Sequence, residues 1–277
     1  EITLLFLSQT VCGVNAIAHK SALFRRVSLE NIYADLTTAG FTLDTWEPSG
    51  LSCRIERAFK AIRSPGETVD IGKFPPSLLE KLFRKPGITD PQVLLGPGMG
   101  EDAAVLDLGD TLLVAKSDPI TSATDRIGRY AVQVNANDVA CTGGTPRWFL
   151  ATLLIPEHFS EEQAEELFSQ VLEACNEINV ALIGGHSEVT YGIDRPLVAG
   201  TMLGEVSRER LVRTGGAQEG DSIVVTKGIA IEGTALLAIE RADKLREAGV
   251  SADTVALSAE LLNVPGISII NDPRIAC

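Results

Sequence analysis

The sequence of 277 residues lacks the cysteine spacing that a structural zinc site requires. Its five cysteines are widely scattered, and no Cys-x-x-Cys pair occurs among them. A disulfide framework is typical of short secreted chains with an even number of cysteines, and this chain fits neither description. The sequence therefore predicts reduced thiols and a cytoplasmic protein.

Long hydrophobic runs are lacking as well. No apolar stretch reaches the roughly 18–20 residues that span a membrane. Residues 2–18 are fairly apolar, but Ser8, Gln9, Thr10 and Asn15 interrupt them, and no basic residue precedes them. This stretch does not fit a signal peptide, and the sequence predicts no membrane partner.

Positive charge is scarce. Lys and Arg number 24 against 37 Asp and Glu, so the formal net charge is −13, which argues against a nucleic-acid partner. A local site built from glycine-rich backbone or a metal ion can still bind phosphate. Residues 1–65 carry seven basic and six acidic side chains, whereas the strong negative charge lies in residues 66–277. This difference predicts that residues 1–69 are an N-terminal extension of unknown role.

Apolar periodicity and turn residues predict strands that alternate with helices. Helices are expected at residues 76–85, 127–140, 161–179, 231–241 and 252–262. Strands are expected at residues 93–95, 103–108, 111–117, 180–183, 197–206, 222–226 and 267–270. In the helix at 161–179, Ser160 is expected to cap the start, and Phe168, Val171, Leu172 and Cys175 to form the apolar face. The predicted fold class is α/β or α+β.

Polar side chains stand at four points beside these elements. They are Glu101–Asp102 after a glycine-rich turn, Asp118 after a strand, the group Asn135, Asn137 and Asp138 within a helix, and His186–Glu188 in an expected loop after Gly184–Gly185. Carboxylates are the ligands that Mg²⁺ prefers, and Mg²⁺ commonly shares its shell with nucleotide phosphates. Taken alone, the glycine-rich segment is more often a plain turn and His186 more often a hydrogen-bonded loop residue, Asp118 could be a turn residue, and the helix group could be a solvated face. Together they indicate a magnesium-nucleotide site.

Four segments in this order resemble the aminoimidazole ribonucleotide (AIR) synthase superfamily, also called PurM-like. They are GEDAAVLDLGD (100–110), SDPI (117–120), VNANDVACTGGTPRW (134–148) and GGHSEVT (184–190). The superfamily includes AIR synthase, formylglycinamidine synthase, thiamine monophosphate kinase, selenophosphate synthetase and the hydrogenase maturation protein HypE. The resemblance covers about residues 70–277. It is strongest to HypE-like, AIR synthase-related proteins, on AKSDPI, GGHSEVT and TKGIAIEGTALLA (226–238).

The resemblance implies a mixed-sheet domain at residues 70–207 that forms a homodimer and binds ATP and Mg²⁺ near the dimer interface. Residues 208–277 would be the start of a PurM-like C-terminal domain. Matched position by position, the metal ligands would be Asp102, Asp118, Asp138 and Glu188. The nucleotide would lie against Gly98, Gly100, Glu101, Asp102, Ser117, Asn135, Asn137 and Gly185. Lys116 and His186 would be the catalytic residues.

Two positions depart from the HypE-like pattern. The first is His186, which stands where such members carry an acid after the double glycine, so either Glu188 supplies the missing charge or His186 contacts phosphate.

The second departure is at the end of the sequence. The chain begins with Glu1 and ends in Pro-Arg-Ile-Ala-Cys277, whereas HypE ends in Pro-Arg-Ile-Cys with a reactive thiol. Either Cys277 is an interior residue of a truncated chain or it is a functional terminal thiol.

The function implied by the resemblance is ATP- and Mg²⁺-dependent activation of a substrate oxygen by phosphorylation. The HypE-like version acts in hydrogenase maturation, as a ligase or dehydratase with a maturation protein as partner. The alternatives are a phosphotransferase similar to thiamine monophosphate kinase and a nucleotide-binding dimer without turnover.

Overall fold

The computed structural model describes residues 72–85, 87–216, 219 and 226–270. The described residues 72–85 belong to one compact unit, and the described residues between 87 and 270 belong to another. The described part of the first unit is helix α4 (Pro76–Phe83), where a helix was expected at 76–85. Pro76 opens α4, which is favourable because the first helical turn needs no N–H bond there.

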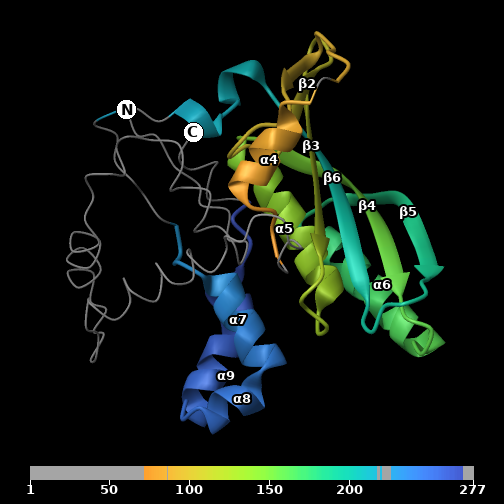
Figure 1. Ribbon diagram of the computed structural model, residues 1–277, viewed down its shortest axis with the longest axis vertical. Coiled ribbons are helices and arrows are strands. Elements are labelled where there is room, and N and C mark those ends of the chain that lie inside the picture. Colours follow the sequence, from red (N-terminus) through yellow and green to blue (C-terminus); the bar gives the residue numbers. More distant parts are fainter. Residues whose placement is uncertain (1–71, 86, 217–218, 220–225, 271–277) are drawn as a thin grey trace. The chain divides into compact units, whose positions relative to one another are not determined.

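The second unit contains one six-stranded sheet (Figure 1). Its strands are β1 (Val93–Leu95), β2 (Ala104–Asp107), β3 (Leu112–Ile120), β4 (Thr145–Ile155), β5 (Ala181–Val189) and β6 (Leu197–Val206), in the order β1-β2-β3-β6-β4-β5. β4 and β5 run parallel, and the other neighbouring pairs are antiparallel. The sheet is therefore mixed, and the predicted α/β class is confirmed.

Two of these strands differ from the sequence prediction. β4 was not predicted, because Pro146 and Arg147 interrupt the start of its apolar run. β5 was expected to end at Ile183 and to be followed by a loop, but the strand continues to Val189. That expectation was wrong, because Gly184 and Gly185 adopt positive φ angles of 151° and 146° and stay paired with β4.

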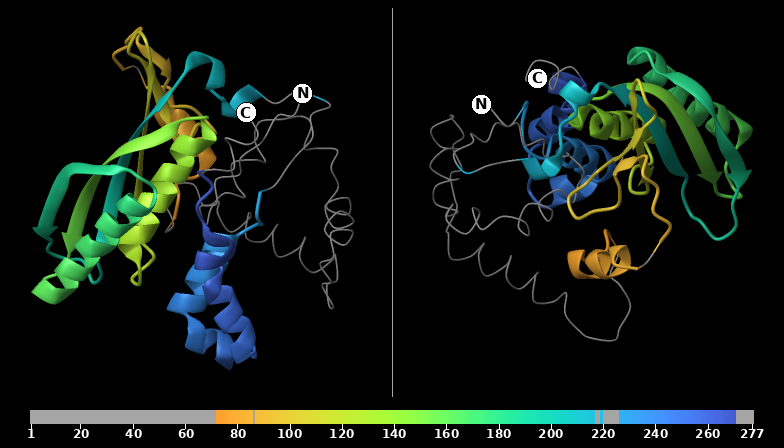
Figure 2. Two further views of the ribbon diagram at one scale, coloured as in Figure 1. Left: turned by 180° about the vertical axis from the view of Figure 1, so that it is seen from behind. Right: turned by 90° about the horizontal axis from the view of Figure 1, so that it is seen from above.

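Helices α5 (Ile127–Cys141) and α6 (Glu161–Glu177) pack on one face of the sheet, as Figures 1 and 2 show. α5 is the central helix, and 13 of its 15 residues are buried. Along β6, buried residues alternate with partly buried ones, as expected for a strand whose two faces differ in cover. The other face of β6 is therefore less covered than the face that α5 contacts.

Helix α6 begins at the predicted cap. The Ser160 hydroxyl accepts a hydrogen bond from the Gln163 N–H, and the Gln163 side chain accepts one from the Ser160 N–H. The predicted apolar face was partly wrong, because Phe168 and Leu172 are exposed. The buried residues of α6 are Leu167, Val171, Ala174 and Cys175, a stripe turned by about one residue from the expected one.

After β6 the chain forms two short 3-10 turns (Arg208–Arg210 and Thr214–Gly216) and then α7 (Ile231–Glu240), α8 (Ala242–Glu247), α9 (Ala252–Glu260) and a π-type turn (Leu262–Gly266). α8 was not predicted. The strand expected at 267–270 does not form, and the strand expected at 222–226 lies almost entirely outside the described residues.

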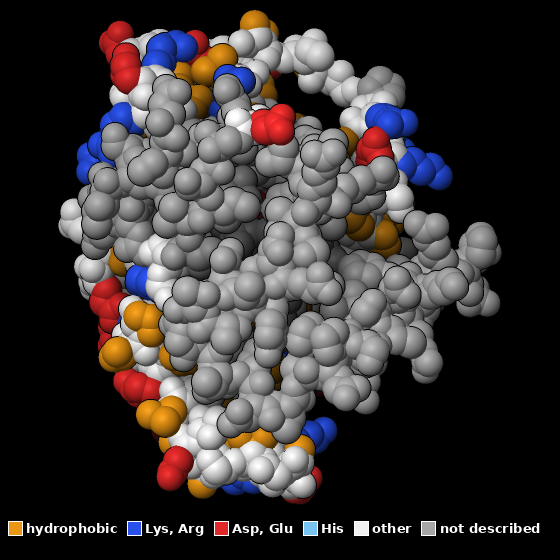
Figure 3. Space-filling view, turned by 90° about the vertical axis from the view of Figure 1, so that its left-hand side faces the viewer, with side chains coloured by type: hydrophobic (Ala, Val, Ile, Leu, Met, Phe, Trp, Pro, Cys, Tyr) orange, Lys and Arg blue, Asp and Glu red, His pale blue; other side chains and the backbone are white. Residues whose placement is uncertain are grey.

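On the face seen in Figure 3, the visible described side chains are a mixture of acidic, basic and hydrophobic groups. Leu237, Leu257 and Val264 are among the exposed large hydrophobic residues of the chain after β6. Cys141 and Cys175 are free thiols, and Cys12, Cys53 and Cys277 lie outside the described residues. Within the described ranges, none of the helices has the length and hydropathy to cross a bilayer.

Candidate functional site

Three of the predicted charged residues meet between β3 and α5. Lys116 and Asp118 are two positions apart on β3, so their side chains leave the strand on the same face, the one covered by α5. Asp138 lies in the last turns of α5. The Lys116 Nζ is 2.7 Å from Asp138 Oδ2 and 3.7 Å from Asp118 Oδ2. The register of the strand and the packing of the helix thus create an acid–base–acid cluster.

Asp102 belongs to the same electrostatic environment. It is exposed and lies two residues before β2, which pairs with β3 through Ala104 and Ala115. Its negative charge contributes to raising the pKa values of Lys116, Asp138 and Cys141. Asp102 therefore adds negative charge to a cluster whose contacting members are Lys116, Asp118 and Asp138.

Burial controls the protonation of this cluster. Only 2% of the Asp138 side chain is exposed, and burial raises the pKa of Asp138 to about 6, although the Lys116 ammonium opposes the shift. Burial disfavours the charge on Lys116 too, but the Asp138 and Asp118 carboxylates outweigh it and raise the pKa of Lys116. The contact between the two side chains therefore favours the charged form of each.

Asn135 connects α5 to β3 next to this cluster. Its Nδ2 donates to the backbone oxygens of Asp118, at 3.1 Å, and Ala131, at 2.8 Å. Its Oδ1 is buried and has no hydrogen-bond partner. Gly200 on β6 permits this approach, because a Cβ there would lie 2.6 Å from Asn135 Nδ2. Sequence reasoning did not single out Gly200, although glycines inside a strand commonly mark such close contacts.

The glycine-rich turn leads directly into Asp102. The Glu101 N–H donates to the Gly98 oxygen at 3.2 Å, and Gly100 has a φ of +81°, which favours glycine. Glu101 is partly buried. The structure thus places Gly98, Gly100 and Glu101 in one tight turn that leads into Asp102.

Two predicted nucleotide-binding residues have other partners. Asn137 is buried, its Nδ2 donates to the Ile267 oxygen at 2.8 Å, and its Oδ1 accepts from the Ile269 N–H at 2.9 Å. The Ser117 hydroxyl donates to the Gly200 oxygen at 3.0 Å and accepts from the Thr201 hydroxyl at 3.1 Å. As a neighbour of Lys116 on a strand, Ser117 points to the opposite face of the sheet.

The remaining predicted site residues lie on β5, at the edge of the sheet. Two strands, β6 and β4, lie between β3 and β5. Because neighbouring strands are about 4.8 Å apart, β3 and β5 lie roughly 14 Å apart. His186 Nε2 is 3.0 Å from Glu188 Oε2, and the Thr190 hydroxyl donates to Glu188 Oε1. These contacts hold the pKa of Glu188 below its usual range. Within one chain, His186 and Glu188 are therefore not brought to the Asp118 cluster.

Gly185 is packed too tightly for a side chain. A Cβ at this position would overlap the backbone of Ala151 on the neighbouring strand β4. The residue is thus required by the pairing of β4 and β5. Its position beside Ala151 also lies away from β3.

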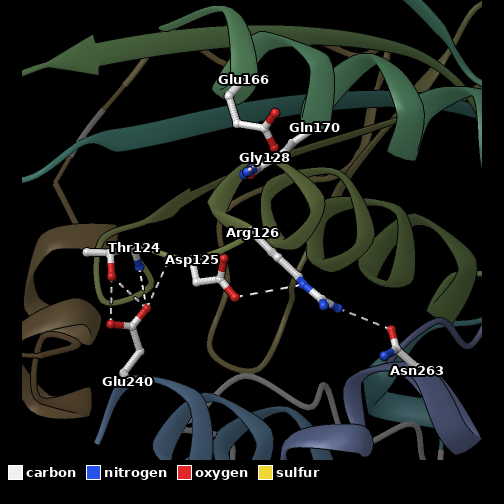
Figure 4. A network of polar contacts seen from close by, with 8 residues as sticks. All are labelled: Thr124, Asp125, Arg126, Gly128, Glu166, Gln170, Glu240 and Asn263. Atoms are coloured by element: carbon white, nitrogen blue, oxygen red, sulfur yellow. Dashed lines mark hydrogen bonds and ion pairs between the residues drawn. The ribbon is translucent and has the colours of Figure 1, made fainter. Parts of the chain in front are cut away.

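The N-terminal end of α5 is held by a network that sequence reasoning did not predict (Figure 4). The Glu240 carboxylate accepts hydrogen bonds from the N–H groups of Thr124 and Asp125, at 2.6 and 3.0 Å, and from the Thr124 hydroxyl. The Arg126 guanidinium donates to Asn263 Oδ1 at 3.3 Å. Such pairs, more than 100 residues apart, carry no local sequence signal.

This architecture, a mixed sheet with two helices on one face and an acidic cluster between β3 and α5, defines an α/β domain with a candidate cation and phosphate site. Residues 100–206 match the family described as AIR synthase related protein, N-terminal domain. This match agrees with the resemblance found in the sequence.

Individual relatives agree with this assignment. A hydrogenase expression/formation protein of Methanocaldococcus jannaschii is 34% identical over 142 residues, which are 50% of this chain and 42% of the relative. The selenide, water dikinase of Yersinia pestis is 29% identical over 218 residues, 72% of this chain and 60% of the relative. The chain thus spans about half the length of these curated relatives.

Solved structures share the fold. The thiamine monophosphate kinase of Aquifex aeolicus has a TM-score of 0.52 and 21% identity, covering 72% of this chain and 62% of that one. AaThiL complexed with AMPPCP and TMP has a TM-score of 0.54 and 23% identity, covering 72% of this chain and 60% of that one. At these identities the likeness establishes the fold alone, and it is the PurM-like fold that the sequence predicted.

Proposed function

We propose that this chain binds ATP with Mg²⁺ and transfers the γ-phosphoryl group to an oxygen of its substrate, as a HypE-like member of the family. ADP leaves, and the phosphorylated oxygen becomes a leaving group. The observation that carries the proposal is the contact of Lys116 with both Asp118 and Asp138 between β3 and α5. The name of the Methanocaldococcus relative supports the hydrogenase-related version.

The residues of the cluster fit a divalent cation by their chemistry. Mg²⁺ prefers carboxylate and amide oxygens, and the buried Asn135 Oδ1 is an oxygen without a hydrogen-bond partner beside Asp118. Asp102, Asp118 and Asp138 would hold the cation. When bound, Mg²⁺ neutralises the negative charge of the transferring phosphoryl group.

The other side chains of the site have simpler tasks in this proposal. The turn at Gly98–Gly100 would offer its backbone N–H groups to phosphate oxygens. Asn135 holds the Asp118 backbone, and α5 keeps Asp138 away from water. Lys116 offsets phosphate charge. The nucleotide domain would occupy residues 70–207, and residues 208–277 would begin the second domain.

We further propose that the domain acts as a homodimer, with the nucleotide near the interface, and that a maturation protein is the partner. The partly buried face of β4 and β6 supports an interface with a second copy. Because they lie about 14 Å from β3 in their own chain, His186 and Glu188 would contact the partner protomer or contribute to its nucleotide site.

A small-molecule kinase is the second candidate. The selenide, water dikinase matches 72% of this chain, a larger share than the hydrogenase-related protein matches. AaThiL, a structure of the same fold, was solved with AMPPCP and TMP. The two candidates differ in the acceptor and share the use of the Asp118 cluster.

Asp118→Asn tests the proposed function. The change keeps the size of a side chain that is 20% exposed but removes its charge, so the fold should stay intact while Mg²⁺-dependent nucleotide binding is lost. Titration calorimetry with AMPPCP and Mg²⁺ measures the loss, and Asp110→Asn, at an exposed turn, is the matched control. Unchanged affinity of Asp118→Asn would remove Asp118 from the site. Nucleotide binding without ADP release for any acceptor would favour the dimer without turnover.

A further inference from the structure

Lys116 lies in the place that a cation bound by the acidic cluster would need. Its ammonium group contacts Asp138 at 2.7 Å and Asp118 at 3.7 Å, and only 12% of its side chain is exposed. The charge of Asp102 also acts on it. Strand β3 is hydrogen-bonded on both sides, by β2 and β6, so the backbone of Lys116 is fixed while its four-carbon stem can move.

The same carboxylate oxygens cannot serve the ammonium and a divalent cation at once. Asp138 is almost fully buried, and its Oδ2 lies 2.7 Å from the Lys116 Nζ. In the part of the chain that the structure describes, no three His, Cys, Asp or Glu side chains are grouped as a ready metal site. The carboxylates are thus arranged around the lysine and not around a metal ion.

On the basis of the proposed nucleotide function, we propose that Lys116 is an internal counter-cation that occupies the divalent-cation position until nucleotide arrives. In this state its ammonium neutralises Asp138 and Asp118 and keeps them in place. When Mg²⁺ and nucleotide bind, the ammonium leaves Asp138 and turns to a phosphate oxygen. Lys116 is thereby a positioning residue: its ammonium pairs with the carboxylates before nucleotide binds and with a phosphate oxygen afterwards.

This exchange has a thermodynamic consequence. Mg²⁺ alone must displace Lys116 from Asp138 and offers the ammonium no new anion, so it binds weakly. A nucleotide phosphate provides that anion, so Mg²⁺ and nucleotide each raise the affinity for the other. Coupling between two ligands is typically roughly 5–150-fold, and it is reciprocal. Lys116 would thus prevent the site from filling with metal in the absence of substrate.

Lys116→Gln tests the exchange, because it removes the charge and keeps a hydrogen-bond donor for Asp138. The measurement is calorimetric titration with Mg²⁺ alone, and with Mg²⁺ in the presence of saturating AMPPCP. We expect Lys116→Gln to bind Mg²⁺ alone at least about 5-fold more tightly than the wild type and to lose most of the coupling. Lys244→Gln, an exposed lysine on α8, makes the same change in net charge and should leave both values unaltered.

Thermal denaturation provides a second readout that does not depend on nucleotide. Without Mg²⁺, Lys116→Gln leaves the buried Asp138 charge without its partner and should melt below the wild type; Mg²⁺ alone should restore it. If Lys116→Gln proves too unstable, Lys116→Gln/Asp138→Asn removes the buried charge. The double variant should then melt above Lys116→Gln without Mg²⁺ and gain less from Mg²⁺.

The possible outcomes separate the inference from the proposed function. If both proteins bind Mg²⁺-nucleotide but Lys116→Gln gains no affinity for Mg²⁺ alone, the counter-cation role is wrong and the function stands. If Lys116→Gln gains Mg²⁺ affinity while neither protein binds nucleotide, the nucleotide function is wrong and Lys116 still guards a cation site. If neither protein binds Mg²⁺ or nucleotide, both are wrong.

Discussion

Replacing Glu240 measures how strongly the end of α7 holds the loop before α5. Oε1 of Glu240 accepts hydrogen bonds from the Thr124 N–H, the Thr124 hydroxyl and the Asp125 N–H, and Oε2 accepts from the Thr124 hydroxyl (Figure 4). In Glu240→Gln the amide oxygen can keep the position of Oε1, but the charge is lost. In Glu240→Ala all of these contacts are lost.

The size of the effect follows from the role of the carboxylate. Glu240 satisfies two backbone N–H groups just before a helix, as an N-cap side chain does, and removing such a side chain costs about 0.5–2 kcal/mol. Because the contacts include a charge, we expect about 1–2 kcal/mol for Glu240→Ala and about half of that for Glu240→Gln. At about 2–4 °C per kcal/mol for a unit of this size, Glu240→Ala should melt about 2–8 °C lower.

The direction of the Glu240 pKa shift predicts how the stability difference between wild type and Glu240→Ala changes with pH. Partial burial opposes the charge of Glu240, but hydrogen bonds from Thr124 and Asp125 outweigh it and hold its pKa below the usual 4.5. A lowered folded-state pKa contributes stability that is present above 4.5 and is lost as the pH falls through the lowered value. The difference between wild type and Glu240→Ala should therefore be constant from pH 7 to pH 5 and shrink at more acidic pH.

Thermal denaturation followed by circular dichroism at pH 7, 5 and 3.5 is the assay. Glu247→Gln, an exposed residue at the end of α8, makes the same charge change as Glu240→Gln and should melt like the wild type. Equal melting temperatures for wild type and Glu240→Ala at pH 7 would refute the reasoning. A difference that is the same at pH 3.5 and pH 7 would refute the role of the charge.

Two further substitutions test the packing around α5. Gly200→Ala brings a Cβ to 2.6 Å from Asn135 Nδ2 and should destabilise the fold by about 1–3 kcal/mol in urea titration, whereas Gly215→Ala, which has open space, should be neutral. Asn137→Ala leaves two buried backbone groups without partners and should cost about 1–3 kcal/mol. It should also speed hydrogen exchange at the Ile269 N–H, and an unchanged rate would contradict the assigned contact.

The charged part of the site could be predicted from the sequence because it depends on local rules. Lys116 and Asp118 share a face because side chains alternate along a strand, and Asp138 lies on a helix that is buried on nearly every side. Order along the chain and residue type thus singled out these residues, while their role as metal ligands, which the family resemblance implied, stays a prediction. The distances within the cluster, and the central position of Lys116, depend on how α5 packs against β3.

Other features required tertiary information. Apolar residues at 167, 168, 171, 172, 174 and 175 fill two adjacent stripes of α6, and only the sheet decides which stripe is buried. Gly184 and Gly185 read as a turn, but pairing with β4 extends the strand through them. His186 and Glu188 were thus expected beside the acidic cluster, and the strand order places them at the sheet edge.

Strand β6 is the last strand of the sheet along the chain, yet it lies in the middle, between β3 and β4. As the chain leaves the ribosome, β1 to β3 can pair in succession and β4, α6 and β5 can close as a crossover unit. The two halves stay unjoined until residues 197–206 emerge, and β3 and β4 meanwhile each expose an unpaired edge. We therefore expect nascent chains to be most prone to aggregation before residues 197–206 emerge, because β6 is the strand that joins the two halves of the sheet.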